Sequence, residues 1–416
     1  MRKRDFLKLS ATLLGSSLVA PAYAAGEAAP TPITGGAQPI GPTEHKRRLR
    51  KAQALMARHD IDALILEPGS SMTYFSGVQW WRSERLTAVV VPRTGNIAVV
   101  TPYFEEPSVR ESLALEGEVR TWHEHESPFD LLAGMLRDRK FAHGRIGIES
   151  TVRYFVSDGL RRAAAGTTLV AADPVVNGCR MFKSQAELAL MRAAAEVTMT
   201  AYRRVHAQLH EGMAGADVIA LMNQTQSALG GSNPWSMALV GPGSAYPHGT
   251  AEKAVVRDGQ IVLMDCGCSV HGYQSDISRT FVFGEASKRQ REVWQTVRDG
   301  QQVAFEAARV GRPAGEVDDA VRAFYQSKGY GPDYRTPGLS HRTGHGIGMD
   351  GHEPINFVRG ETTKLAPGMC LSNEPGIYIF GEFGVRLEDC LYMTADGPKW
   401  FTVPPATLDN PLGTMG

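Results

Sequence analysis

Cysteine is scarce in this sequence: there are 5 among 416 residues, and none forms a C-x-x-C pair. This gives no sign of a disulfide framework or a zinc knuckle, so we expect free, buried thiols. An excess of charge of one sign is also lacking, because 44 Lys and Arg balance 44 Asp and Glu to a net charge of +0. That balance argues against a nucleic-acid partner, which needs a basic surface. No stretch reaches the roughly 18 uninterrupted apolar residues of a spanning helix, so we expect no membrane span in the mature protein.

The N-terminus has the three parts of an export signal in order. A basic segment at 2–8 precedes the apolar stretch Leu9 to Ala20, and Ala22-Tyr23-Ala24 is a cleavage pattern. We therefore predict a signal peptide over 1–24 and a periplasmic or secreted protein; the alternative is an amphipathic start to a cytoplasmic protein. The segment is similar to a twin-arginine signal, with Lys3 in place of the first arginine. Residues 25–42, rich in Ala, Gly, Pro and Thr, are expected to form a flexible tether.

The remaining chain divides into two predicted domains. Its 43% hydrophobic and 21% charged residues are typical of a globular protein. Helix and strand patterns alternate over 43–175, which predicts an α/β domain. The pairs Asp173-Pro174 and Asn177-Gly178 indicate a turn at its end, followed by a second domain at 176–416. Helices are expected there at 184–209, with a capping box from Ser184 and Glu187, and at 216–229, 288–310 and 314–328.

Two aspartates in the second domain flank a predicted hairpin. Strand-like runs on either side of His271-Gly272 bring Asp265 and Asp276 roughly opposite each other across the ladder. Like charges in that arrangement repel, so a divalent cation is expected between them. The alternative is a pair of surface carboxylates, which the apolar run Ile-Val-Leu-Met before Asp265 disfavours.

Two further segments carry histidines and glutamates. His341, His345 and His352 lie within a dozen residues among glycines, a density that favours a site over structural histidines. Glu374 precedes Pro375-Gly376, and Glu388 lies in a later strand-like run; either alone could be a solvated charge. Four carboxylates and a histidine suit two divalent first-row ions, such as manganese or cobalt, whose four positive charges would balance the carboxylates.

Together these motifs resemble one known family, the pita-bread metallopeptidases, in the branch of Xaa-Pro peptidases (prolidase and aminopeptidase P). The resemblance rests on the two aspartates of the hairpin and on further motifs in the same order: Gly241-Pro242-Gly243 leading to His248, Gly344-His345-Gly346-Ile347-Gly348, His352-Glu353-Pro354, Asn373-Glu374-Pro375-Gly376 and Val385-Arg386-Leu387-Glu388-Asp389. It implies an α+β fold, in which a creatinase/prolidase-like α/β domain precedes a pita-bread domain with a curved antiparallel sheet and flanking helices.

The resemblance also implies a role for each residue of the site. Two divalent ions, manganese expected and cobalt or zinc as alternatives, would be held by Asp265, Asp276, His345, Glu374 and Glu388, with Asp276 and Glu388 bridging. A hydroxide shared by the ions would be the nucleophile and Glu374 the general base. His248 and His352 would contact the scissile amide and the oxyanion. Substrate or ligands would be oriented by His341, Tyr378 and Arg386.

The expected substrate is a dipeptide or short peptide with proline at its second position. Dipeptidase and aminopeptidase remain equally open, and the alternatives are a same-fold hydrolase or lyase for a non-peptide small molecule and a non-enzymatic binding protein. The family implies a homodimer. Trp80, Trp81 and Arg82 are either part of a substrate pocket completed by the second subunit or an ordinary aromatic cluster.

Overall fold

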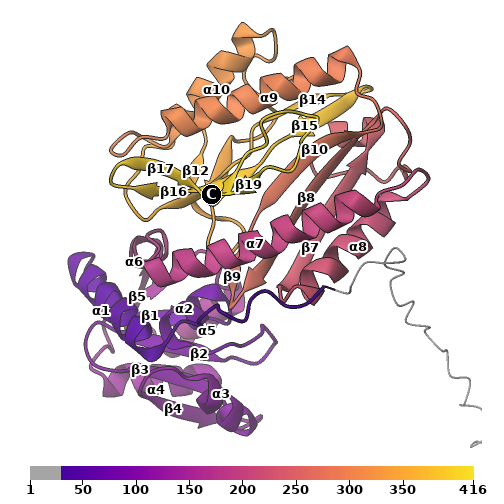
Figure 1. Cartoon of the computed structure of the whole chain (residues 1–416). Coiled ribbons are helices and arrows are strands. Elements are labelled where there is room, and N and C mark those ends of the chain that lie inside the picture. Colours follow the sequence, from indigo (N-terminus) through magenta and orange to yellow (C-terminus); the bar gives the residue numbers. More distant parts are fainter. Residues whose placement is uncertain (1–29) are drawn as a thin grey trace, which may run out of the picture.

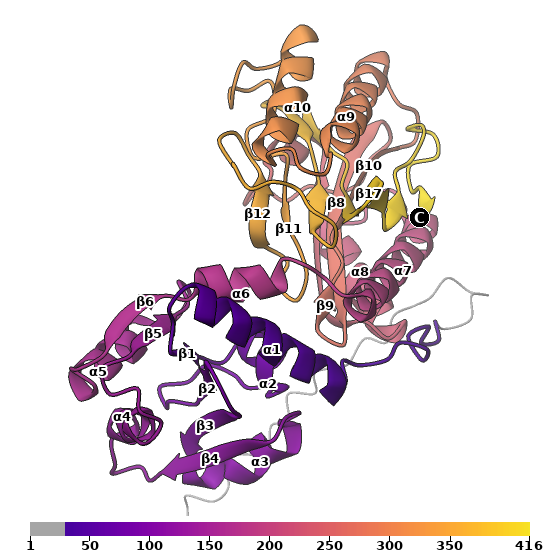
Figure 2. The same ribbon diagram turned by 90° about the vertical axis from the view of Figure 1, so that its left-hand side faces the viewer.

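The computed structural model describes residues 30–416, so the predicted signal at 1–24 lies outside the described residues. The chain forms an N-terminal domain that ends with helix α6 (Asp173–Arg180) and a C-terminal domain that begins with helix α7 (Gln185–Gln208) (Figure 1; Figure 2). The α+β class expected from the sequence is confirmed. Within the described part of the chain, no helix has the length and apolar character needed to cross a bilayer.

The N-terminal domain is a six-stranded mixed sheet covered by helices on both faces. The strand order is β4-β3-β2-β1-β5-β6. The pairs β1-β2 and β2-β3 are antiparallel, and the pairs β3-β4, β1-β5 and β5-β6 are parallel. Successive residues of β1 point into two different cores, so both faces of the strand are buried. The strands are β1 (Ala63–Leu66), β2 (Ala88–Pro92), β3 (Ile97–Pro102), β4 (Gly117–Trp122), β5 (Arg145–Ile148) and β6 (Thr168–Ala171). The helices are α1 (Pro42–Arg58), α2 (Ser70–Ser76), α3 (Glu106–Ser112), α4 (Pro128–Asp138), α5 (Tyr154–Ala163) and α6 (Asp173–Arg180).

The turn expected at Asn177-Gly178 is wrong, because both residues lie inside α6. Pro174 stands in the first turn of this helix, where a missing N–H costs nothing. Val175, Val176 and Cys179 are buried in the same core as α1. Burial of this apolar face outweighs the weak helix propensity of Asn and Gly.

Part of the expected tether is packed against the C-terminal domain. Ile33 N–H donates to the Leu229 carbonyl at 2.9 Å, and the Thr34 hydroxyl donates to the Gly230 carbonyl at 3.4 Å. Ala37 and Ile40 contact the core beneath α7 and α8 (Gly215–Ala228). The stretch from 30 to 41 is therefore held in place rather than free, while 25–29 lie outside the described residues.

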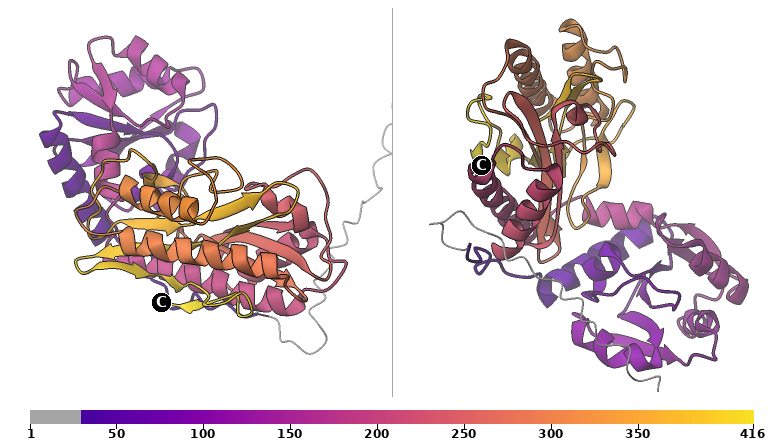
Figure 3. Two further views of the ribbon diagram at one scale, coloured as in Figure 1. Left: turned by 90° about the horizontal axis from the view of Figure 1, so that it is seen from above. Right: turned by 90° about the vertical axis from the view of Figure 1, so that its right-hand side faces the viewer.

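The C-terminal domain places its strands between two pairs of helices (Figure 1; Figure 3). One pair packs on the sheet of order β10-β8-β7, and the other covers the sheet of order β12-β11-β13-β16-β17 together with the hairpin β14-β15. The helices are α7 (Gln185–Gln208), α8 (Gly215–Ala228), α9 (Lys288–Ala307) and α10 (Gly315–Ser327). The strands are β7 (Ser232–Val240), β8 (Gln260–Val270), β9 (Tyr273–Gln274), β10 (Ile277–Phe283), β11 (Gly344–Gly346), β12 (Glu353–Phe357), β13 (Cys370–Asn373), β14 (Gly376–Ile379), β15 (Phe383–Arg386), β16 (Asp389–Thr394), β17 (Gly397–Trp400), β18 (Thr402–Val403) and β19 (Thr414–Met415).

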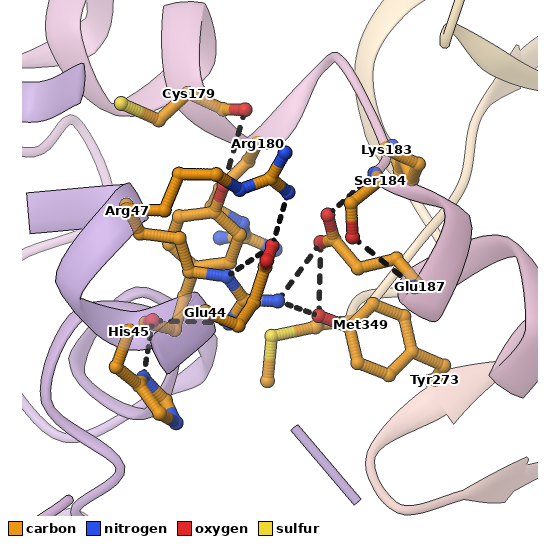
Figure 4. Close-up of polar contacts among 12 residues, drawn as sticks. Glu44, His45, Arg47, Cys179, Arg180, Lys183, Ser184, Glu187, Tyr273 and Met349 are labelled. Atoms are coloured by element: carbon orange, nitrogen blue, oxygen red, sulfur yellow. Dashed lines mark hydrogen bonds and ion pairs between the residues drawn. The ribbon is translucent and has the colours of Figure 1, made fainter. Parts of the chain in front are cut away.

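A buried ion pair joins the two domains where α7 begins (Figure 4). The predicted capping box is confirmed: the Ser184 hydroxyl accepts from Glu187 N–H, and the Glu187 carboxylate accepts from Ser184 N–H at 2.8 Å. The other carboxylate oxygen of Glu187 lies 3.2 Å from Arg48 of α1 and accepts from the Tyr273 hydroxyl at 2.9 Å. Arg48 is 3% exposed, so this contact fixes α1 against the hairpin that carries Asp276.

Candidate metal centre and active site

The predicted hairpin of the two aspartates is present, with its turn at His271-Gly272. Both turn residues have positive φ, 46° and 83°, as a two-residue hairpin turn of the I′ type requires. Asp265 pairs with Ser278 across the β8–β10 ladder. Asp276 precedes β10, so the two aspartates are diagonal neighbours rather than directly opposite. This offset leaves room for a ligand between their side chains.

The two glutamates lie where the chain passes from one sheet to another. In the five-stranded sheet Asn373 pairs with Asp389, and in the neighbouring hairpin Gly376 pairs with Arg386. Glu374 follows the first of these strands and Glu388 precedes its partner strand. Outside the ladders their side chains are free to converge on the same space. The sheet geometry therefore brings together Glu374 and Glu388, which are fourteen positions apart in the sequence.

His345 directs one ring nitrogen at three carboxylates. Its Nδ1 donates to the Gly346 carbonyl at 3.0 Å, which leaves the lone pair on Nε2. Nε2 lies 3.3 Å from Glu374 Oε1, 3.6 Å from Asp276 Oδ2 and 3.9 Å from Glu388 Oε1. Burial lowers the pKa of His345 to about 3, so the ring is neutral and a ligand rather than an ion-pair partner. Asp276, His345 and Glu388 offer donor atoms that all lie within 4.8 Å of one another.

The buried carboxylates of this cluster are not neutralised by enough positive charge in the described structure. Burial raises the pKa of Asp276 and Glu388 well above the usual carboxyl range, and repulsion from Asp265 and Glu374 adds to both shifts. Burial also raises the pKa of Glu374 to about 7, with Asp265 adding to the shift and Arg386 opposing it. Asp265 Oδ1 and Glu388 Oε1 are buried without a hydrogen-bond partner in the described structure. Hard oxygen donors and one imidazole in this state fit a divalent cation, which would satisfy both the charge and the orphaned oxygens.

Three of the predicted orienting residues form a chain of hydrogen bonds that ends on Asp265. The Arg386 guanidinium donates to Asp265 Oδ2 at 2.7 Å and to the Tyr378 oxygen at 3.1 Å. The Tyr378 hydroxyl donates to His341 Nε2 at 2.8 Å, because His341 Nδ1 is committed to the Arg342 carbonyl. Burial, with Arg386 nearby, lowers the pKa of His341 to about 3. The chain fixes Asp265 through a neutral histidine and a buried arginine.

The metal-binding cluster opens into a cavity of about 740 Å³. His248 and His352 both line it, and the His352 ring lies 4.1 Å from that of His345 between centroids. Sequence reasoning missed Trp235 and Arg342, which line the same cavity. Trp235 had no signal in the sequence, because it reaches the cavity only through the pairing of β7 with β8. Arg342 stands next to His341 and could have been included with it.

Two serines that hold the carboxylates were also missed. The Ser278 hydroxyl donates to Glu388 Oε2 at 2.8 Å, and the Ser372 hydroxyl donates to Glu374 Oε1 at 3.3 Å. Ser372 also accepts from His345 N–H at 3.0 Å. Serine is common in every kind of structure, so its role became visible only when the strands were paired.

The residues Trp80, Trp81 and Arg82 lie apart from this cavity. The two indoles stack with centroids 4.8 Å apart, and Trp81 is 65% exposed. Arg82 lines a second cavity of about 660 Å³ between the domains. His352 forms part of the wall of both cavities. Within the described chain, the walls of the 740 Å³ cavity, the candidate catalytic cavity, come from the C-terminal domain.

The fold and the site define a class: an α+β hydrolase-type scaffold with a buried carboxylate and imidazole centre for divalent cations. Residues 189–395 match the model of metallopeptidase family M24, and residues 48–182 match the creatinase/prolidase N-terminal domain. The chain belongs to metallopeptidase family M24, as the resemblance predicted.

Curated relatives span almost the whole chain. It is 33% identical to the probable dipeptidase PepE of Mycobacterium tuberculosis, over 85% of this chain and 93% of that protein. It is 30% identical to the Xaa-Pro dipeptidase of Lactobacillus helveticus, over 85% and 96%. The crystal structure of dipeptidase PepE from Mycobacterium ulcerans superposes with a TM-score of 0.82 at 30% identity, over 89% of this chain and 98% of that one.

Proposed function

We propose that the protein hydrolyses the Xaa-Pro bond of dipeptides or short peptides at a centre of two divalent ions, with manganese as the expected metal. The observation that carries this proposal is the Nε2 lone pair of His345 facing Asp276, Glu374 and Glu388. The printed names of relatives supply the substrate class: one is an Xaa-Pro dipeptidase that this chain covers over 96% of its length. Asp265, held by Arg386, completes the set of five ligands.

Glu374 is the residue that we propose as general base. The bound ions would supply Lewis-acid polarisation and a water of lowered pKa. Glu374 has the highest exposure of the three carboxylates around His345, with 14% of its side chain accessible, so it can reach both the cavity and the cluster. As general base, its carboxylate would accept the proton of the attacking water and pass it on to the leaving nitrogen.

His248 and His352 are proposed to bind the reacting amide. Both line the cavity from segments outside the sheets. The Pro247 carbonyl accepts from Arg386 at 3.1 Å, which ties the segment of His248 to the ligand Asp265. Hydrogen bonds from these rings to the developing oxyanion and to the amide nitrogen would lower the barrier. A proline at the second substrate position brings no amide N–H, so the site needs no acceptor for one.

The test is hydrolysis by the purified protein loaded with manganese. The dipeptide Met-Pro, the tripeptide Met-Pro-Ala and the matched non-proline dipeptide Met-Ala would be compared as substrates. Bound metal would be measured by elemental analysis. Cleavage of Met-Pro alone identifies a dipeptidase, and cleavage of the tripeptide an aminopeptidase. A protein with two bound ions that cleaves neither would refute the proposal and favour a non-peptide substrate on the same scaffold.

Export and dimerisation are proposed on separate grounds. The signal-like sequence at 1–24 supports a periplasmic or secreted protein. Edman degradation of the protein from the periplasm or the culture medium should then give Ala25 as the N-terminal residue. An intact Met1 in that fraction would argue against processing. The family resemblance supports a homodimer, which sedimentation equilibrium would distinguish from a monomer.

A further inference from the structure

Backbone bonds tie the beginning of the segment that carries His352 to its own domain: Ile347 N–H donates to the Cys370 carbonyl, and Gln274 N–H donates to the Gly348 carbonyl. The segment runs from the end of β11 to the start of β12, and two of its backbone N–H groups find partners in a side chain. Glu353 Oε1 accepts from Met349 N–H at 2.9 Å and from Asp350 N–H at 3.2 Å. Gly348 permits this close approach, because a Cβ there would lie 2.8 Å from the Glu353 carboxylate. The residue next to His352 therefore folds back and closes the segment on itself.

Two cations outside this segment hold the Glu353 carboxylate. Arg180, the last residue of α6 in the N-terminal domain, lies 2.5 Å from Oε1, and Lys183 lies 2.9 Å from Oε2. Arg180 ends α6, and Lys183 lies on the connection from α6 to α7 (Figure 4). The side chains of Glu353 and Lys183 are 4% and 2% exposed, so these are buried contacts. Although burial opposes it, Lys183 and Arg180 hold the pKa of Glu353 at about 2.

The N-terminal domain also holds the other side of the segment. Arg180 reaches Asp350 Oδ2 at 2.7 Å, and the Ser70 hydroxyl at the start of α2 donates to Asp350 Oδ1 at 2.5 Å. The Met349 side chain packs against the core of the N-terminal domain. Residues 349, 350 and 353 thus all contact that domain or the connection to it, while His352 between them faces the catalytic cavity.

We infer that Arg180, acting through Glu353, is a positioning residue for His352, so that the N-terminal domain sets the place of a catalytic group in the other domain. The inference rests on the proposed role of His352 in catalysis. Arg180 itself does not line the catalytic cavity; it lines the cavity on the far side of the His352 segment. Its effect on the reaction must therefore pass through that segment. Displacing a catalytic group by about 1 Å can cost a factor of about 100 in rate.

A double-mutant cycle separates this role from a purely structural one. In the wild-type background, Arg180→Met should lower kcat about tenfold or more with bound metal unchanged. In the His352→Ala background, it should lower kcat less than about twofold, because there is no ring left to position. The matched control is Arg48→Met, which breaks the other buried interdomain ion pair and should lower kcat by the same factor in both backgrounds.

A second measurement does not depend on activity. Hydrogen exchange by mass spectrometry should show faster exchange of the Met349 and Asp350 amides in Arg180→Met, and no change there in Arg48→Met. If Arg180→Met fails to fold, Arg180→Lys serves instead. One guanidinium nitrogen contacts both Glu353 and Asp350 while the other donates to the Ser71 hydroxyl at 2.9 Å, and a single ammonium cannot occupy both positions. Arg180→Lys should retain more activity than Arg180→Met and show the same pattern in the cycle.

The outcomes separate the two claims. Equal factors for Arg180→Met in both backgrounds, or unchanged exchange at 349 and 350, would overturn the positioning role while leaving the proposed function standing. A His352→Ala variant with wild-type kcat would overturn the catalytic role of His352, and the inference with it.

Discussion

The stability of the C-terminal domain should depend strongly on the buried pair of Arg279 and Asp389. Both side chains are 0% exposed, and the guanidinium binds the carboxylate through two bonds of 2.6 and 3.2 Å. Arg279 also donates to the Glu388 carbonyl at 2.8 Å. The pair therefore fixes the backbone of a proposed metal ligand, and breaking it should affect both stability and metal binding.

The magnitude follows from what each substitution leaves behind. Arg279→Met leaves the Asp389 charge buried with Thr402 and Gln301 as its neutral partners. Asp389→Asn leaves the arginine charge buried with neutral partners, which are backbone carbonyls and the Met199 sulfur. Breaking a buried pair from one side lowers the free energy of unfolding by about 3–5 kcal/mol. The double variant removes both charges, so its loss should be smaller than the sum of the two single losses by at least about 2 kcal/mol. For a domain of about 240 residues, each single loss corresponds to a fall in Tm of about 6–10 °C.

The assay is differential scanning calorimetry of the metal-free protein in chelator, because bound ions would add stability by mass action. Manganese affinity, measured by isothermal titration calorimetry, should fall in both single variants. Arg279→Met removes the hydrogen-bond donor to the Glu388 carbonyl, and Asp389→Asn removes the carboxylate that holds that donor in place. The surface variant Arg312→Met, which breaks the exposed pair with Glu316, is the control and should shift the Tm by no more than about 1 °C. A fall below about 2 °C in either single variant, or a double variant equal to the sum, would refute the reasoning.

Three further predictions concern the centre itself. Glu374→Gln should lower kcat by at least about a hundredfold, measured on an Xaa-Pro substrate with metal content determined in parallel; a wild-type rate would remove Glu374 as the base. His248→Ala and His352→Ala should each lower kcat about a hundredfold or more with the metal retained, and loss of metal would make the residue a ligand instead. The metal-free protein should lose stability as pH rises: the pKa of Glu374 is raised to about 7, so its favourable contribution is complete below its usual pKa and is lost as pH rises through 7. The Tm in chelator should therefore fall between pH 5 and pH 8, and this fall should shrink in Glu374→Gln and with manganese present; a metal-free Tm that rises over this interval would contradict the pKa.

Local patterns in the sequence predicted the elements that position the site. The apolar runs around His271-Gly272 predicted the hairpin of Asp265 and Asp276, because the period of two and the turn residues are local signals. The capping box at Ser184 predicted the start of α7 for the same reason. The turn at Asn177-Gly178 failed because packing of α6 on α1, which is not local, overrode propensity.

The sequence by itself determined which donor atoms are available: oxygen and imidazole ligands in a characteristic order, with no thiolate pair. Their chemistry depends on residue type, which the sequence states directly. Only the tertiary structure decided which of them meet, through the diagonal offset in the hairpin, the two sheet junctions at Glu374 and Glu388, and the tautomer of His345. It also decided which residues support them, because Arg279, Ser278 and Arg180 act across strand pairings and a domain boundary. Such contacts depend on register and packing between distant segments, and no local pattern in the chain records them.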